Sequence, residues 1–222
     1  MSKSKSRRQQ VKQQSALRKN WLAYSVVGVI VIVAGYFIYT ALSGSAPAST
    51  APKQWSSPPP MTIDANKTYT AHIQMAKGTI DVHLLPKDAP IAVNSFVFLA
   101  RQHYFDGVTF HRVLAGFMAQ GGDPTGTGTG GPGYTFDNEV STGLTFADAG
   151  VVAMANTGQP NSNGSQFFIT FAPQPGLNGG YTIFGHVTTG MQVVQAITLR
   201  DPSANPNAPP GDKITTITID EQ

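Results

Sequence analysis

The chain has 222 residues, 41% of them hydrophobic, which is enough to bury the core of one ordinary domain with an additional segment. Its formal net charge is +3, but seven of the fifteen Lys and Arg residues precede Trp21, so the remainder carries 8 basic and 12 acidic residues, a net charge of −4. This mildly acidic body argues against nucleic acid as its partner, because duplex binding depends on clustered basic side chains.

The first element in chain order is an uncharged run of 22 residues from Trp21 to Leu42, WLAYSVVGVIVIVAGYFIYTAL. At about 1.5 Å per residue, a helix of this length spans the hydrocarbon layer, which is roughly 30 Å thick. The basic residues 1–20 should stay in the cytoplasm. We therefore predict a single-pass cell-membrane protein with a cytoplasmic segment 1–20, a transmembrane helix 21–42 and an extracytoplasmic remainder.

Two other interpretations of this run stay open. Ala46-Pro47-Ala48 has the small-x-small pattern of a cleavage site, so the run could belong to a signal peptide, although it exceeds the usual apolar region of about 7–15 residues. A buried core helix is the second alternative. Because the chain has no cysteine, a lipid-modified cysteine and disulfide bonds are both excluded.

Residues 43–60, SGSAPASTAPKQWSSPPP, are rich in Ser, Ala and Pro and carry one charge, so we predict a linker. The triple proline Pro58–Pro60 favours an extended conformation, which would hold the following domain away from the membrane. The domain itself is predicted over residues 61–222.

Two strands and a helix are predicted at the start of this domain. The alternation in TYTAHIQMAKGTIDVHLL predicts two strands joined by a tight turn at Lys77-Gly78. Asp88 is expected to cap the following helix, which has Pro90 in its first turn. The helix should bury one apolar face, made of Val93, Phe96, Val97 and Ala100.

Further short strands are predicted at 150–155, 166–171, 182–187 and 214–219, with a brief helix at 191–197. Many short strands with only two helices favour a β-barrel or a sandwich over a doubly wound sheet, and we prefer the barrel.

The stretch FHRVLAGFMAQGGD (110–123) places an arginine in an apolar run. With period two, Arg112 shares a strand face with Val108, Phe110 and Leu114, while His111 falls on the other face. A guanidinium among apolar side chains is costly unless its donors find a partner or a ligand. Arg112 therefore either has a structural partner or serves a site.

Several other motifs carry no chemistry. Gly126-x-Gly128-x-x-Gly131 matches the dinucleotide fingerprint formally, but neither a preceding strand nor a following helix is predicted around it. The five histidines lack metal-ligand spacing and cysteine partners, so no metal is expected. Ser165 in NGSQ lacks the glycine pattern of a nucleophile elbow.

FHRVLAGFMAQGGD, Met154-Ala155-Asn156 and NGSQFFI (163–169) together resemble the cyclophilins, a family of peptidyl-prolyl isomerases. GTIDVHLLPKDAP, HYFDGVTFHR and IFGHV extend the likeness over about residues 70–220. The resemblance implies a mainly β fold, a closed eight-stranded antiparallel β-barrel with two helices, here preceded by one transmembrane helix. It also implies that the arginine of FHR lies on the outer face of the barrel, beside an apolar pocket for a proline ring.

Site residues follow from the resemblance position by position. Arg112 matches the catalytic arginine, partly satisfied by neighbours such as Gln120, whereas His111 is expected to be a core or hydrogen-bonded histidine. The positions that match the family's substrate-binding residues are Phe117, Met118, Gln120, Asn156, Gln166, Phe168, Leu177 and Tyr181. Many cyclophilins carry tryptophan where this chain has Gly176, and histidine where it has Tyr181, so the pocket should be more open on that side.

The implied reaction is rotation about an Xaa-Pro bond, and it needs no nucleophile, metal or cofactor because no covalent bond breaks. The uncatalysed barrier is roughly 18–20 kcal/mol, and a donor aimed at the proline nitrogen favours the twisted amide. We expect a monomeric isomerase that acts on proline-containing polypeptides and assists protein folding outside the cytoplasm. The alternative is a non-catalytic, membrane-tethered module that binds proline peptides.

Overall fold

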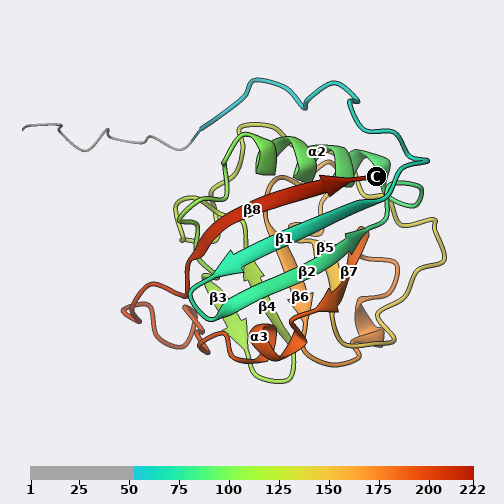
Figure 1. The fold of residues 1–222 in the computed structure, drawn as a ribbon. Coiled ribbons are helices and arrows are strands. Elements are labelled where there is room, and N and C mark those ends of the chain that lie inside the picture. The colour runs from blue at the N-terminus through green and yellow to red at the C-terminus, as the bar shows by residue number, and fades with distance from the viewer. Residues whose placement is uncertain (1–52) are drawn as a thin grey trace, which may run out of the picture. The chain divides into compact units, whose positions relative to one another are not determined.

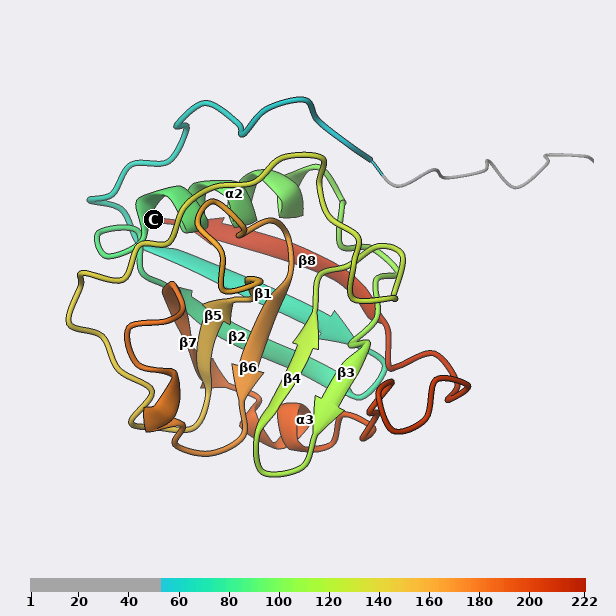
Figure 2. The ribbon, with the colours of Figure 1, turned by 180° about the vertical axis from the view of Figure 1, so that it is seen from behind.

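The fold is built on one antiparallel sheet of eight strands, flanked by two α-helices among the described residues (Figures 1 and 2). The computed structural model describes residues 53–222. The predicted segments 1–20 and 21–42 and the first part of the predicted linker, 43–52, lie outside this range. Within residues 53–222, no helix combines the length and the apolar character that a membrane crossing requires.

The strands and helices predicted within residues 61–222 are present. The bounds of the elements are β1 Tyr69–Met75, β2 Gly78–Leu84, α2 Pro90–Arg101, β3 Arg112–Leu114, β4 Met118–Gly121, β5 Val151–Met154, β6 Phe167–Thr170, η1 Pro175–Leu177 (a 3-10 turn), β7 Ile183–Thr189, α3 Met191–Gln195 and β8 Ile214–Glu221. The turn between β1 and β2 falls at the predicted Lys77-Gly78.

The strand order is β3-β4-β6-β5-β7-β2-β1-β8, and every neighbouring pair is antiparallel. The sheet curls, but its end strands β3 and β8 do not pair with each other as a closed barrel requires. An isolated bridge joins Thr109 to Lys213 instead, and the N–H of Ile214 donates to the carbonyl of Val108 at 2.8 Å. The structure thus shows a curled sheet, and it does not show the expected closure.

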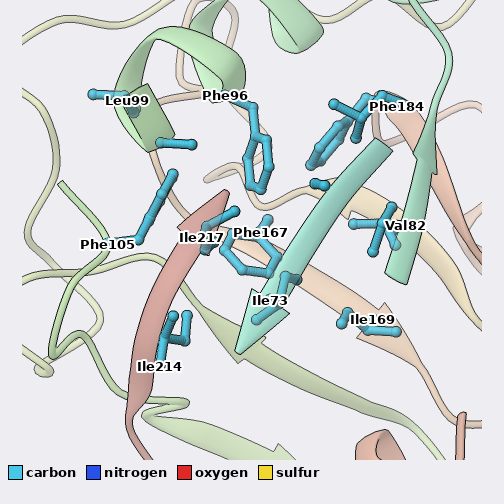
Figure 3. Packing of buried hydrophobic residues seen from close by; sticks show 14 of the residues in the cluster. Ile73, Val82, Phe96, Leu99, Phe105, Phe167, Ile169, Phe184, Ile214 and Ile217 are labelled. Carbon is cyan, nitrogen blue, oxygen red and sulfur yellow. The ribbon is translucent and has the colours of Figure 1, made fainter. Parts of the chain in front are cut away.

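The main core fills the inside of this curl (Figure 3). The four apolar positions predicted for the face of α2 are all at most 3% exposed. Phe96 reaches from α2 to Phe167 on β6 and Phe184 on β7, with ring centroids 5.5 and 5.2 Å away. Burying aromatic rings of this size supplies much of the hydrophobic stabilisation, so the core holds α2 firmly against the sheet.

The cap of α2 differs from the prediction. The N-cap residue is Ala89, not Asp88, and it provides no side-chain hydrogen bond. Glu139, which is distant in sequence, accepts hydrogen bonds from the N–H groups of Ile91 (3.0 Å) and Ala92 (2.9 Å). A carboxylate at this end satisfies free N–H groups and favours the helix dipole, so a long-range contact replaces the expected local cap.

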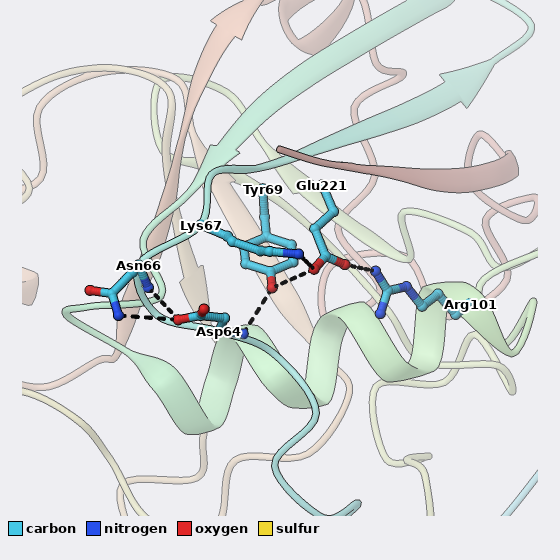
Figure 4. A network of polar contacts seen from close by, with 6 residues as sticks. All are labelled: Asp64, Asn66, Lys67, Tyr69, Arg101 and Glu221. Atoms are coloured by element: carbon cyan, nitrogen blue, oxygen red, sulfur yellow. Dashed lines mark hydrogen bonds and ion pairs between the residues drawn. The ribbon is translucent and has the colours of Figure 1, made fainter.

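A polar network ties β8 to α2 and to the start of β1 (Figure 4). Glu221 accepts from Lys67 at 2.9 Å and pairs with Arg101 of α2 at 2.6 Å. The hydroxyl of Tyr69 donates to Glu221 at 3.2 Å and accepts from the N–H of Asp64 at 2.9 Å. The hydrogen bonds from Lys67 and Arg101 lower the pKa of Glu221 to about 2.

Candidate active site

Arg112 begins β3 and lies half-buried on the outer face of the sheet. The prediction that it shares a face with Phe110 is wrong, because Phe110 belongs to the main core and regular strand geometry starts only at Arg112. Val113 is the β3 residue that points inward. The outward position of Arg112 agrees with what the resemblance implies.

The guanidinium of Arg112 makes no hydrogen bond or ion pair with any side chain or carbonyl in residues 53–222. Gln120 is its cross-strand neighbour in register, but the Gln120 amide donates to Gln166 instead. The guanidinium lies over the ring of Phe117, whose centroid is 5.9 Å from the Arg112 Cζ atom. The five N–H donors of the guanidinium thus stay available to a ligand.

The apolar positions predicted to line a pocket gather beside Arg112 in a second cluster, separate from the main core. Met118 and Phe168 belong to its buried part, and the half-buried Phe117, Leu177 and Tyr181 pack against the cluster. Strands β4 and β6 place Met118 and Phe168 on the same outer face, since Gln120 pairs with Phe168 and Met118 with Thr170. An apolar surface of this kind suits a proline ring.

Sequence reasoning missed Phe146, which completes this cluster. Its ring is fully buried and lies parallel to that of Phe168, with centroids 5.9 Å apart, while Tyr181 meets both rings edge-on. Asn178 holds Phe146 by accepting its backbone N–H at 2.8 Å. Phe146 lies in an irregular segment without periodicity, so no local signal marks it.

Gly176 lies in η1, next to Leu177. A Cβ atom built on Gly176 would meet no other atom within 4 Å. A side chain at position 176 would therefore meet no neighbour at its Cβ atom, and the more open pocket expected on this side stays a prediction.

A chain of polar contacts borders the other side of Arg112. The Gln120 amide donates to the Gln166 side-chain oxygen at 2.9 Å, and the Gln166 amide donates to the carbonyls of Gly128 (3.0 Å) and Gly130 (2.9 Å). Both glutamines predicted to hold substrate are thus oriented by the glycine-rich loop. The loop, which resembled a dinucleotide motif formally, serves here as the support of a hydrogen-bond chain.

Asp123 in turn organises this loop from a fully buried position. One carboxylate oxygen accepts the N–H and the hydroxyl of Thr125, and the other accepts the N–H groups of Thr127, Gly128 and Gly130 at 2.7–3.1 Å. Burial by itself raises the pKa of Asp123, but the hydrogen bonds from Thr125, Gly130 and Gly128 outweigh it and hold the pKa below its ordinary value.

Asn156 follows β5 and closes the polar side of the site. Its side-chain amide donates to the Gly180 carbonyl at 3.0 Å, and its side-chain oxygen accepts the N–H of Gly158 at 2.9 Å. These contacts fix the side chain, whereas the Asn156 backbone makes no hydrogen bond with a described residue. That backbone is free to pair with an extended peptide.

His111 is 1% exposed, and neither ring nitrogen has a hydrogen-bond partner among residues 53–222. Burial is the main reason that its pKa lies below the ordinary value, and the charge of Asp123 opposes this shift. The lowered pKa favours the neutral ring, and the burial of the side chain agrees with its predicted core position.

The outward Arg112 thus lies beside an apolar cluster and a row of amides held by hydrogen bonds, all on the outer face of the sheet. Residues 70–219 match the family model described as "Cyclophilin type peptidyl-prolyl cis-trans isomerase/CLD". The chain therefore belongs to the cyclophilin-type peptidyl-prolyl cis-trans isomerases.

Individual relatives are similar over the same region. A "Peptidyl-prolyl cis-trans isomerase-like 1" of Rhizopus delemar is 49% identical over 136 residues, covering 60% of this chain and 82% of the relative. An Arabidopsis thaliana peptidyl-prolyl cis-trans isomerase is 46% identical over 128 residues, covering 56% and 77%.

Solved structures agree with this relationship. A cyclophilin-type isomerase of Cryptosporidium parvum superposes with a TM-score of 0.63 at 35% identity, covering 70% of this chain and 99% of that one. A second structure of that protein, determined in the presence of the dipeptide Ala-Pro, has a TM-score of 0.62 at 34% identity, covering 69% of this chain and 99% of that one.

Proposed function

We propose that this protein accelerates cis-trans isomerisation of Xaa-Pro bonds in polypeptides, with Arg112 as the catalytic residue. The observation that carries the proposal is the Arg112 guanidinium, which has no partner among the described residues and lies beside the apolar cluster, over the ring of Phe117. The Cryptosporidium parvum relative studied in the presence of Ala-Pro supports a proline-containing substrate.

The reaction follows from the electronic structure of the amide. In the planar ground states the proline nitrogen shares its lone pair with the carbonyl, and in the twisted state it regains that pair as an acceptor. A guanidinium donor aimed at this nitrogen binds the twisted state better than either planar state, so it lowers the barrier. Apolar walls strengthen the hydrogen bond because they exclude water.

The remaining predicted site residues would hold the two ends of the bond apart. The proline ring packs on Met118, Phe168 and Leu177, while the peptide backbone on the other side of the bond pairs with Gln120 and the Asn156 backbone. Rotation then occurs between a fixed ring and a fixed strand of peptide, which reduces the entropic part of the barrier.

The direct test is the exchange between cis and trans isomers of an Ala-Pro-Phe peptide, measured by NMR with the wild-type protein and its Arg112→Ala variant. We expect acceleration by the wild type and a loss of about 100-fold or more in the variant, as for other single transition-state donors. Peptide binding without acceleration in the wild type would identify a non-catalytic proline-peptide module instead.

We further propose that residues 21–42 anchor the enzyme in the cell membrane, with the isomerase domain on the extracytoplasmic side, where it assists the folding of exported proteins. The support is the uncharged run of 22 residues preceded by seven basic ones. Reporter fusions after Gln222 test this topology. A reporter that is active only in the cytoplasm, or a protein released by salt washing of membranes, would contradict it.

A further inference from the structure

The strap, defined as residues Lys53–Pro60, is the end of the predicted linker, and it lies against the isomerase domain (Figure 1). Trp55 is half-buried and meets the ring of Phe98 on α2 edge-on, with centroids 5.2 Å apart, and that of Tyr104 at 5.9 Å. Its backbone N–H donates to the carbonyl of Pro132 at 2.8 Å. Trp55 thus fastens the strap between α2 and the end of the glycine-rich loop.

Both ends of the strap have additional contacts. The side chain of Asn94, which is 3% exposed, donates to the carbonyl of Pro60 at 3.0 Å and accepts the N–H of Thr62 at 2.9 Å. The ammonium of Lys53 donates to the carbonyl of Gln102. A buried amide committed to the strap indicates that α2 is built to receive it, since unpaired buried amides are costly.

The glycine-rich loop also accommodates the strap. Gly133 has a φ of +89°, and a Cβ atom built there would lie 2.6 Å from the carbonyl oxygen of Trp55. The two backbones therefore approach each other so closely that no larger residue fits at Gly133.

This placement brings Gln54 to the wall of a hollow of about 700 Å³. The same hollow is lined by Gln120, Asn156 and Gln166, the polar residues of the candidate active site, and it does not include Arg112 or Phe168. None of its lining residues is charged. The hollow therefore suits a neutral, polar side chain next to the proline of a bound peptide.

We propose that Gln54 is a specificity-determining residue, which the strap brings to the peptide site so that its amide hydrogen-bonds a neutral polar side chain beside the substrate proline. This inference rests on the proposed isomerase function and adds a residue from outside the region that matches the family. Gln54 is exposed in the free protein, so its amide is available to a peptide without prior rearrangement.

The test uses the full-length protein and two series of peptides that share one Xaa-Pro pair. In the first series the residue before this pair is Ala, Gln or Glu, and in the second series the residue after it is varied in the same way. Both kcat/KM, from NMR exchange, and the dissociation constant are measured for each peptide. The variants are Gln54→Ala, Trp55→Ala, which releases the strap, and Ser57→Ala, an exposed strap residue outside the hollow, as the matched control.

We expect the wild type to prefer Gln over Ala in one of the two series. Gln54→Ala and Trp55→Ala should both reduce that preference by about two- to tenfold, the range for one hydrogen bond, and leave the Ala peptide unchanged. Ser57→Ala should match the wild type. An equal change for all peptides, or none in any peptide, would overturn the role of Gln54.

Failure of the underlying function would be recognised separately. If the wild type accelerates no peptide, or Arg112→Ala keeps full activity, the proposed catalysis is wrong. The preference for Gln over Ala peptides can still be measured in that case, because the dissociation constants report it without catalysis. A wild-type preference that survives Gln54→Ala in those constants refutes the inference whether or not the protein is an enzyme.

Discussion

Asp123→Asn is the substitution that most directly tests how the glycine-rich loop is held. Asparagine has nearly the same shape, but it replaces one carboxylate oxygen by an NH2 group, which donates instead of accepting. In one orientation Thr125 loses its acceptor, and in the other the N–H groups of Thr127, Gly128 and Gly130 lose theirs. The Thr125 hydroxyl can rotate and accept, so one backbone N–H group faces another donor in the first orientation and three do in the second.

Each buried donor left without an acceptor costs about 1–3 kcal/mol, and more when the lost partner was charged. One to three such donors together correspond to about 1–9 kcal/mol. Because the loop lies at the surface and can relax toward solvent, we expect a total destabilisation of about 2–4 kcal/mol, in the lower half of this total. For a protein of this size that corresponds to a decrease in Tm of about 5–15 °C.

The free energy of unfolding is measured by urea titration, and protection of the loop amides by native-state hydrogen exchange. Asp137→Asn is the matched control, since Asp137 is exposed and its side chain makes no hydrogen bond or ion pair with a described residue. A destabilisation below about 1 kcal/mol by Asp123→Asn, with loop protection unchanged, would refute the reasoning.

The same substitution should also impair the enzyme. The carbonyls of Gly128 and Gly130 orient Gln166, and Gln166 orients Gln120. Because these glutamines hold the peptide but do not contact the rotating nitrogen, we expect KM to rise more than kcat falls. A fall in kcat at constant KM would assign Asp123 a different role.

Three further changes have defined outcomes. Phe146→Ala should lower the free energy of unfolding by about 3–5 kcal/mol, because it removes the ring stacked on Phe168. It should also lower kcat/KM for Xaa-Pro peptides. An unchanged midpoint of urea unfolding would contradict this reasoning. His111 has a lowered pKa, so its neutral form stabilises the fold above pH 6.5, its ordinary pKa, and this contribution is lost as the pH falls. His111→Leu should therefore flatten the stability curve below about pH 6.5, whereas an identical slope would show that other groups control it. Glu221, with its pKa of about 2, stabilises the fold above its ordinary pKa of 4.5 and loses that effect toward pH 2. Glu221→Gln should remove this part of the acid transition, monitored by circular dichroism.

Much of the local structure could be predicted from the sequence. The alternation of apolar and polar residues predicts the strands β1 and β2 and the turn between them at Lys77-Gly78. The apolar face predicted for α2 is buried as expected. These patterns succeed because burial of one face imposes a period on the nearby sequence. The motifs FHR, GFM, MAN and NGSQFFI, through their family resemblance, also predict that Arg112 and the apolar pocket residues lie in one neighbourhood.

Only the tertiary structure decided the features that depend on residues far apart in the chain. Phe146 completes the apolar cluster, Glu139 caps α2, and the strap brings Gln54 to the hollow that Gln120 and Gln166 line. None of these contacts produces a periodic pattern in the sequence. Arg112 faces outward because regular pairing begins only there, after the chain has turned to meet the segment before β8. By itself the sequence determined the elements and the motif residues; packing between distant segments determined which face each one presents.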